Sequence, residues 1–155
     1  MKSAIRRVMI AIPVAILLAW GPRYSLVAMA PQHTSVTVTN LYTGDDKESH
    51  SRQLEMKFVP VAGASGLATQ SQAVKVTTAY VVRLAPGFYE SWHNADKRRY
   101  VIVMSGRAEV EVAGGQKIIL SPGQLVLAED LTGKGHTFRV LGTEDWVALF
   151  VDFAQ

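Results

Sequence analysis

The stretch that decides the fold is YVIVMSGRAEVEV, residues 100–112. Two runs rich in β-branched residues flank the turn sequence Ser105-Gly106, and the second run alternates glutamate with alanine or valine. Successive side chains of a strand point to opposite faces, so the glutamates share one face and the valines the other. The stretch therefore predicts a β-hairpin with one buried and one exposed face.

Short apolar runs bounded by turn residues continue on both sides of this hairpin. Gly114-Gly115 and Ser121-Pro122-Gly123 are expected turns, and the polar segment 43–52 and the Ala, Gly, Ser and Gln-rich segment 60–72 are expected loops. The sequence has no helical apolar period of sufficient length and no repeat of 20–50 residues. Short strands at this spacing predict an all-β barrel or sandwich. The expected strands are residues 36–39, 54–59, 75–84, 100–104, 108–112, 117–120, 124–128, 136–141 and 146–153.

Residues 1–30 follow the plan of a signal peptide. A positive stretch to Arg7 precedes the apolar stretch 8–20, and a small-x-small site ends at Ala30. The apolar stretch is shorter than the ~20 residues that span a bilayer, so we expect export to the periplasm or medium and no permanent membrane span once the leader is cleaved. Pro31 directly after this site leaves the cleavage position open.

Charge and cysteine content exclude several classes of protein. The 155 residues carry a net charge of +3, but four of the 16 basic residues lie in the leader, which leaves 12 basic against 13 acidic residues. The basic surface of a nucleic-acid binder is therefore missing, and nucleic acid is rejected as a partner. With no cysteine, disulfides, thiolate metal sites and a cysteine nucleophile are excluded.

Residues 86–140 resemble the cupin superfamily, whose two motifs lie on paired strands of a small β-barrel. The first motif is matched by Pro86-Gly87, Trp92-His93-Asn94-Ala95 and Ser105-Gly106, and the second by Ser121-Pro122-Gly123 and the segment TGKGH, residues 132–136. The combination looks like a group of small bacterial cupin proteins with no established activity. The resemblance implies a single-domain cupin-type β-barrel, that is, a double-stranded β-helix or jelly roll. It divides the chain into a signal peptide (1–30), N-terminal strands and loops packing on the barrel (31–72) and the barrel core (73–155).

The resemblance also implies a ligand-binding pocket. His93 and His136 match one histidine of each motif, whereas Ala95 and Arg99 stand where a metal-binding cupin carries its second histidine and its glutamate. The expected pocket therefore contains His93, Arg99, Asp130 and His136. Either Arg98 or Arg99 should point inward, because they alternate along a strand, and an inward Arg99 needs Asp130, Glu109 or an acidic ligand as partner.

A metal site and a metal-free site remain open alternatives. His93 and His136 can bind one divalent Zn, Fe, Ni or Mn ion if Asp130 or Glu129 completes the set, but an arginine nearby repels a cation and favours an anion. The leading hypothesis is an exported cupin-domain protein that binds a small polar or acidic molecule. The alternatives are a metal-dependent oxygenase, isomerase or lyase, whose catalytic residues the sequence does not name, and an inert structural dimer. The resemblance and the apolar C-terminal strand predict a homodimer.

Overall fold

The computed structural model describes residues 34–64 and 67–154. The expected signal peptide and the stretch around Ala30 lie outside the described residues. Thr34–Gln155 form one compact unit. Throughout the described part of the chain there is no α-helix, and no helix has the length and apolar character needed to cross a membrane.

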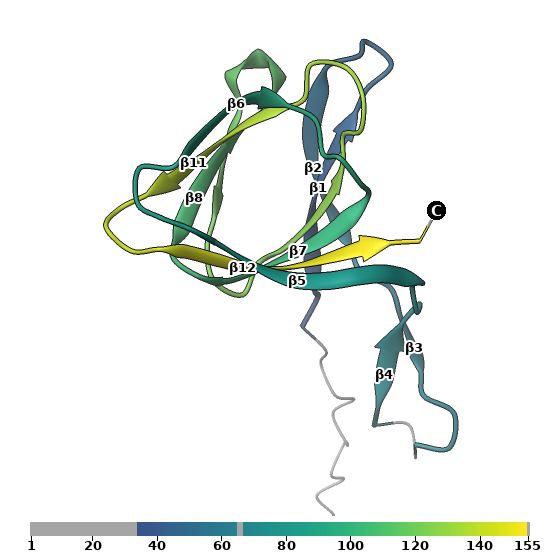
Figure 1. Cartoon of the computed structure of the whole chain (residues 1–155). Coiled ribbons are helices and arrows are strands. Elements are labelled where there is room, and N and C mark those ends of the chain that lie inside the picture. The colour runs from purple at the N-terminus through teal and green to yellow at the C-terminus, as the bar shows by residue number, and fades with distance from the viewer. Residues whose placement is uncertain (1–33, 65–66, 155) are drawn as a thin grey trace, which may run out of the picture. The chain divides into compact units, whose positions relative to one another are not determined.

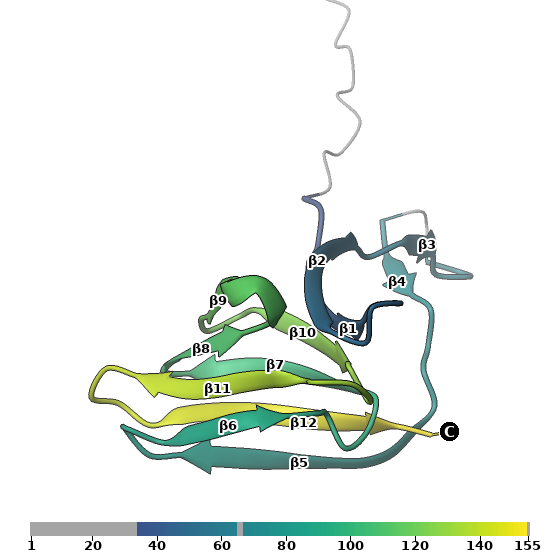
Figure 2. The same cartoon turned by 90° about the horizontal axis from the view of Figure 1, so that it is seen from above.

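Ten strands form two facing sheets that enclose the core, and Figures 1 and 2 show them around a shared interior. The six-stranded sheet has the order β2 (Ser49–Glu55), β1 (Thr37–Thr43), β10 (Leu125–Glu129), β7 (Arg99–Ser105), β12 (Trp146–Phe153) and β5 (Val76–Leu84). The four-stranded sheet has the order β6 (Tyr89–His93), β11 (His136–Leu141), β8 (Arg107–Glu111) and β9 (Lys117–Leu120). A two-stranded hairpin, β3 (Phe58–Pro60) and β4 (Thr69–Ser71), and a short 3₁₀ turn at Ala113–Gly115 complete the described elements.

The two strands expected at residues 100–112 are confirmed as β7 and β8, but the expected hairpin is wrong, because β7 and β8 do not pair with each other and enter different sheets. Val110 is 1% exposed, whereas Glu109 and Glu111 on the other face are half-buried. Gly106 makes this corner possible, because it has φ +70° and a Cβ there would lie 2.4 Å from the Asp145 carbonyl oxygen.

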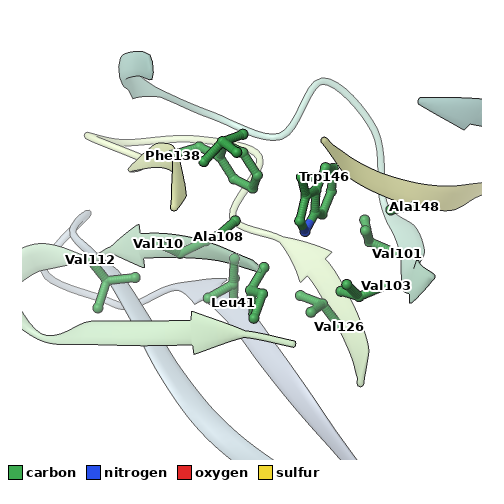
Figure 3. Close-up of a cluster of buried hydrophobic side chains, with 12 residues drawn as sticks. Leu41, Val101, Val103, Ala108, Val110, Val112, Val126, Phe138, Trp146 and Ala148 are labelled. Atoms are coloured by element: carbon green, nitrogen blue, oxygen red, sulfur yellow. The ribbon is translucent and has the colours of Figure 1, made fainter. Parts of the chain in front are cut away.

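The core consists of the inward side chains of both sheets (Figure 3). Trp146 lies at its centre, 1% exposed, and its ring contacts Phe138 edge-on with centroids 4.9 Å apart. The side chains come from strands far apart in the sequence, so the core forms only when both sheets do. The buried cluster is Leu41, Val101, Val103, Ala108, Val110, Val112, Leu120, Val126, Phe138, Val140, Trp146 and Ala148.

The N-terminal strands are part of the larger sheet. β1 pairs in parallel with β10 and antiparallel with β2, and Leu41 of β1 belongs to the core cluster. Strands on both sides of the domain boundary expected at residue 72 therefore belong to the same sheet.

Three expectations about strands are wrong. Segment 43–52 is not all loop, because β2 begins at Ser49 and pairs with β1 along its full length. The run expected at 54–59 is broken, since it contains the end of β2 and the start of β3. The loop expected at 60–72 contains β4, and β6 is a strand that the sequence pattern missed. β2 and β6 are polar edge strands, so they lack the apolar alternation that marks a half-buried strand.

The C-terminal strand, on which the predicted dimer partly rested, does not lie at the edge of a sheet. The C-terminal strand β12 lies between β7 and β5, so it is an inner strand and has no free edge. Among the described strands, β5 is the terminal strand of the six-stranded sheet, and Val76, Tyr80 and Val81 on it are 50%, 41% and 59% exposed. A nine-residue edge strand with no proline and a single charge, Arg83, is open to pairing with another chain.

Candidate functional site

A cavity of about 330 Å³ lies between the two sheets. Its wall is mostly apolar, and its polar side chains gather where β6, β7 and β11 meet. The apolar wall consists of Leu41, Leu84, Ala95, Val101, Val110, Leu120, Val126, Ala128, Phe138, Trp146 and Phe150, and the polar side chains are Glu90, His93, Asn94, Asp96, Arg99 and His136.

His136 begins β11 and is held by a buried carboxylate. Its Nδ1 lies 2.6 Å from Oδ2 of Asp130, and the two side chains are 9% and 0% exposed. Nδ1 donates its proton to this carboxylate, so Nε2 is the ring atom that carries the lone pair whenever the ring is neutral. Asp130 therefore fixes the tautomer and orientation of His136 from behind, and it is not among the residues that line the cavity.

His93 ends β6 directly opposite His136 in the sheet register. The two ring centroids are 4.4 Å apart. His93 Nδ1 lies 2.8 Å from the backbone oxygen of Ser91, which can only accept, so Nδ1 carries a proton and Nε2 is the ring atom left for a ligand. In their neutral forms the two rings present two hydrogen-bond acceptors.

A β-bulge in β6 adds Glu90 to this site. Between the pairs His136 with His93 and Phe138 with Glu90, β6 has one residue more than β11, so Glu90 and His93 face the cavity together although three positions apart. The Glu90 carboxylate lies 3.5 Å from Nε2 of His93. Glu90 was not expected at the site, because no strand was predicted over β6, and regular alternation along such a strand would have placed Glu90 and His93 on opposite faces.

Several contacts clamp the loop between β10 and β11 that carries Asp130. The Asn94 amide donates to the backbone oxygens of Asp130 and Thr132, at 3.2 Å and 2.8 Å. The Ser49 hydroxyl donates to the Gly135 carbonyl. Gly135 has φ +75°, and a Cβ there would lie 1.9 Å from the His93 carbonyl oxygen, so only glycine allows this approach.

Arg99 points inward and is already charge-compensated. Its side chain is 8% exposed, its Nε lies 2.9 Å from Oδ1 of Asp152, and Nη2 donates to Asp96. The Nε contact is an ion pair and not a hydrogen bond, because neither atom has a hydrogen-bond partner of suitable geometry. Lys97 adds a second cation 3.5 Å from Oδ2 of Asp152. Asp152 is 2% exposed, so this network compensates a buried carboxylate with two cations next to the cavity.

The two side chains expected as partners of Arg99, Asp130 and Glu109, are wrong. Asp130 is bound to His136, and Glu109 pairs with Arg139 on β11 and Lys117 on β9. Glu129, expected as a possible third ligand, bonds to Arg98 and to Asn40 and is not in the cavity lining. Of the four residues expected in the pocket, the structure thus brings His93, Arg99 and His136 to the cavity and places Asp130 behind His136.

The residues present do not complete a metal centre. The two Nε2 atoms suit a divalent transition metal, but in the described part of the chain no group of three histidine, aspartate or glutamate side chains is arranged to hold an ion. Asp130 would have to leave His136 Nδ1 to become a ligand. We therefore derive no chemistry through a metal.

Two carboxyl groups outside the cavity have lowered pKa values. A hydrogen bond from His50 lowers the pKa of Asp46 on the loop before β2. Desolvation acts to raise the pKa of Glu109, but the hydrogen bonds and charges of Arg139 and Lys117 together outweigh it, and that pKa is lowered. Both groups belong to surface ion pairs that hold neighbouring segments together.

Comparison with known proteins bears on the fold. The chain is similar to a cupin-like protein of Thermotoga maritima (21% identity, 65% of this chain and 68% of that one, TM-score 0.43). It is also similar to a Cupin 2 conserved barrel domain protein of Salinispora arenicola (18% identity, 64% and 75%, TM-score 0.41). No curated protein matches the sequence. Residues 80–152, from Tyr80 within β5 to Asp152 within β12, match the family model of the cupin domain, and the described part of the chain has an all-β fold.

Proposed function

We propose that this chain is an exported cupin-domain protein that binds a small molecule in the cavity between its sheets. The observation that carries the proposal is a cavity of about 330 Å³ with apolar walls and polar side chains gathered at one end. Cavities of this size and lining are typical of small-molecule sites. The apolar walls suit an apolar ligand body, and the polar end suits one hydrogen-bonding group.

The polar end supports a polar ligand more strongly than an acidic one. Arg99, which suggested an acidic ligand, is paired with Asp152 and Asp96. The Nδ1 atoms of His93 and His136 are occupied by Ser91 and Asp130, so only Nε2 of each ring is left for a ligand. In a neutral ring this atom accepts a hydrogen bond, which suits a ligand donor and not a carboxylate.

A metal-dependent enzyme remains the second candidate. The observation in its favour is that both imidazoles are held through Nδ1, which is how protein metal ligands are commonly oriented. Metal analysis of protein purified without an affinity tag tests it. One metal ion per chain would establish this candidate, and protein without metal would favour simple ligand binding.

The binding proposal is tested by filling the cavity. Ala128 is 7% exposed and lines the cavity, so Ala128→Phe places a ring where the ligand body would lie. The matched control is Ala79→Phe on the exposed strand β5. The probe is 2-phenylethanol, followed by calorimetry and thermal unfolding. We expect binding to the parent and to Ala79→Phe, and loss of binding in a folded Ala128→Phe. Equal binding to all three proteins would place the probe elsewhere and refute the proposal.

Export rests on the pattern of residues 1–30. Fractionation of bacteria that express the full chain tests it, with a 31–155 variant as the control that should stay in the cytoplasm. Full-length protein found only in the cytoplasm would contradict export.

A further inference from the structure

We infer that the ligand's polar end is a hydrogen-bond donor, and that an alkylammonium group fits it best. This inference rests on the proposed function and names the class of ligand. It is carried by three features of the polar end: the tautomers of the two histidines, the position of Glu90 and the pairing of the cations.

Each of the two histidines, in its neutral form, can offer one hydrogen-bond acceptor to a ligand in the cavity. His136 is 7% exposed and its Nδ1 is committed to Asp130, and the Nδ1 of His93 is committed to the Ser91 carbonyl. The ring atom opposite in each case is Nε2, which accepts in the neutral form. A ligand donor satisfies these nitrogens, whereas an alkyl carboxylate confronts them with another lone pair.

Glu90 makes a cation the better donor. Its carboxylate lies 3.5 Å from Nε2 of His93, so a neutral His93 turns a lone pair toward the carboxylate and the two groups can share one donor. An ammonium group has three N–H donors and a positive charge, so it can donate to both imidazoles and to Glu90 together. A hydroxyl has one proton and can satisfy only one of them.

The charged side chains around the polar end of the cavity also favour a cationic ligand. The cations beside the cavity are Arg99 and Lys97, and both are held by Asp152, with Asp96 as a further partner of Arg99. Asp130 and Glu90 add two more carboxylates on the histidine side. Four carboxylates against two cations leave a negative balance that attracts an ammonium ion and repels a carboxylate.

The aromatic part of the wall suggests the probes. Phe138, Trp146 and Phe150 line the cavity and suit a phenyl body. 2-Phenylethylamine, 2-phenylethanol and phenylacetate share that body and differ in the polar end. Titration of the purified full chain by calorimetry, near neutral pH and in buffer free of divalent metal, compares them directly.

We expect 2-phenylethylamine to bind about tenfold more tightly than 2-phenylethanol, because charge-assisted hydrogen bonds are about twice as strong as neutral ones, and phenylacetate to bind most weakly. Glu90→Gln should weaken the amine about fivefold, as loss of a half-exposed charge pair does, and leave the alcohol unchanged. The control Glu111→Gln changes a half-buried glutamate on β8 that is not in the cavity lining. It should leave all three affinities unchanged.

The outcomes separate the two proposals. Tightest binding by phenylacetate, or an amine affinity that is the same in Glu90→Gln and the parent, overturns the donor inference and leaves the proposed function standing. The proposed function itself is overturned if none of the three probes binds. It is also overturned if all three bind the cavity-filled Ala128→Phe as tightly as they bind the parent.

Discussion

Gly135 links the fold to the site, and Gly135→Ala should separate the two histidines. The new Cβ would lie 1.9 Å from the His93 carbonyl oxygen, whereas ordinary contact begins near 3.4 Å, so the His93 backbone would have to move by 1.5 Å. All three obstructing atoms, the oxygen and carbon of the His93 carbonyl and the amide nitrogen of Asn94, belong to the backbone and cannot rotate away. The movement would break the pairing of His93 with His136 where β6 meets β11.

The expected loss of free energy of unfolding is judged against a matched control, Gly123→Ala. Gly123 also has a positive φ, +85°, but a Cβ there meets nothing within 4 Å, so Gly123→Ala isolates the backbone cost of about 1–2 kcal/mol. Gly135→Ala adds the broken pairing and the lost support of the loop, so we expect it to lower the free energy of unfolding by more than about 4 kcal/mol. Urea unfolding followed by tryptophan fluorescence measures both variants, and binding of 2-phenylethanol should be lost only in Gly135→Ala. Equal losses of stability, with binding retained in both variants, would refute the reasoning.

Three further predictions concern the charges and the sheet edge. Arg99→Leu leaves Asp152 buried without its main partner and should lower the free energy of unfolding, measured in urea, by about 3–5 kcal/mol. A second change, Asp152→Asn, should restore part of this loss. If the losses of the two single variants simply add in the double variant, the pairing is contradicted. Because the pKa of Glu109 is lowered in the folded state, its ionised form stabilises the fold at neutral pH, and this contribution disappears as the pH falls below about 4. Glu109→Gln should therefore cost at most about 1 kcal/mol at neutral pH and nothing measurable in acid, and a pH-independent cost would argue against the ion pair with Arg139. Light scattering at micromolar concentration should give the mass of a dimer for the parent protein. Val81→Lys places a charge on the open edge of β5 and should give the mass of a monomer. A monomeric mass for the parent would reject dimer formation.

The sequence predicted strands that have a clear side-chain pattern. The alternation of Glu109, Val110 and Glu111 corresponds to β8 because Val110 meets the core, and the β-branched run corresponds to β5, which pairs with β12 although most of its residues are exposed. The polar strands β2 and β6 were missed, since an edge strand is held by backbone hydrogen bonds that leave little trace in the side chains.

The site was only partly accessible to sequence reasoning. The motif spacing pointed to His93 and His136, and the expectation that Arg98 and Arg99 face opposite sides agrees with their exposed and buried positions. The partners of Arg99 were not predictable, because Asp152 is more than fifty residues away and reaches it only through the pairing of β12 with β7. Glu90 was not predicted because strand β6 was missed, and the bulge in β6 would have defeated simple alternation as well.

These differences change how Arg99 should be tested. Arg99→Glu, which the sequence alone suggests as a way to restore a metal ligand, would place a third carboxylate beside Asp152 and Asp96. We expect such a variant to lose stability through charge repulsion before its metal affinity can be compared with that of the parent.

The most direct test of the central claim is a crystal structure of the protein grown with 2-phenylethylamine. The account predicts electron density for the phenyl ring among the apolar residues of the cavity, with the amine nitrogen within hydrogen-bonding distance of Nε2 of His136. Density for the amine only on the outer surface, with the cavity filled by water or by rearranged side chains, would contradict it.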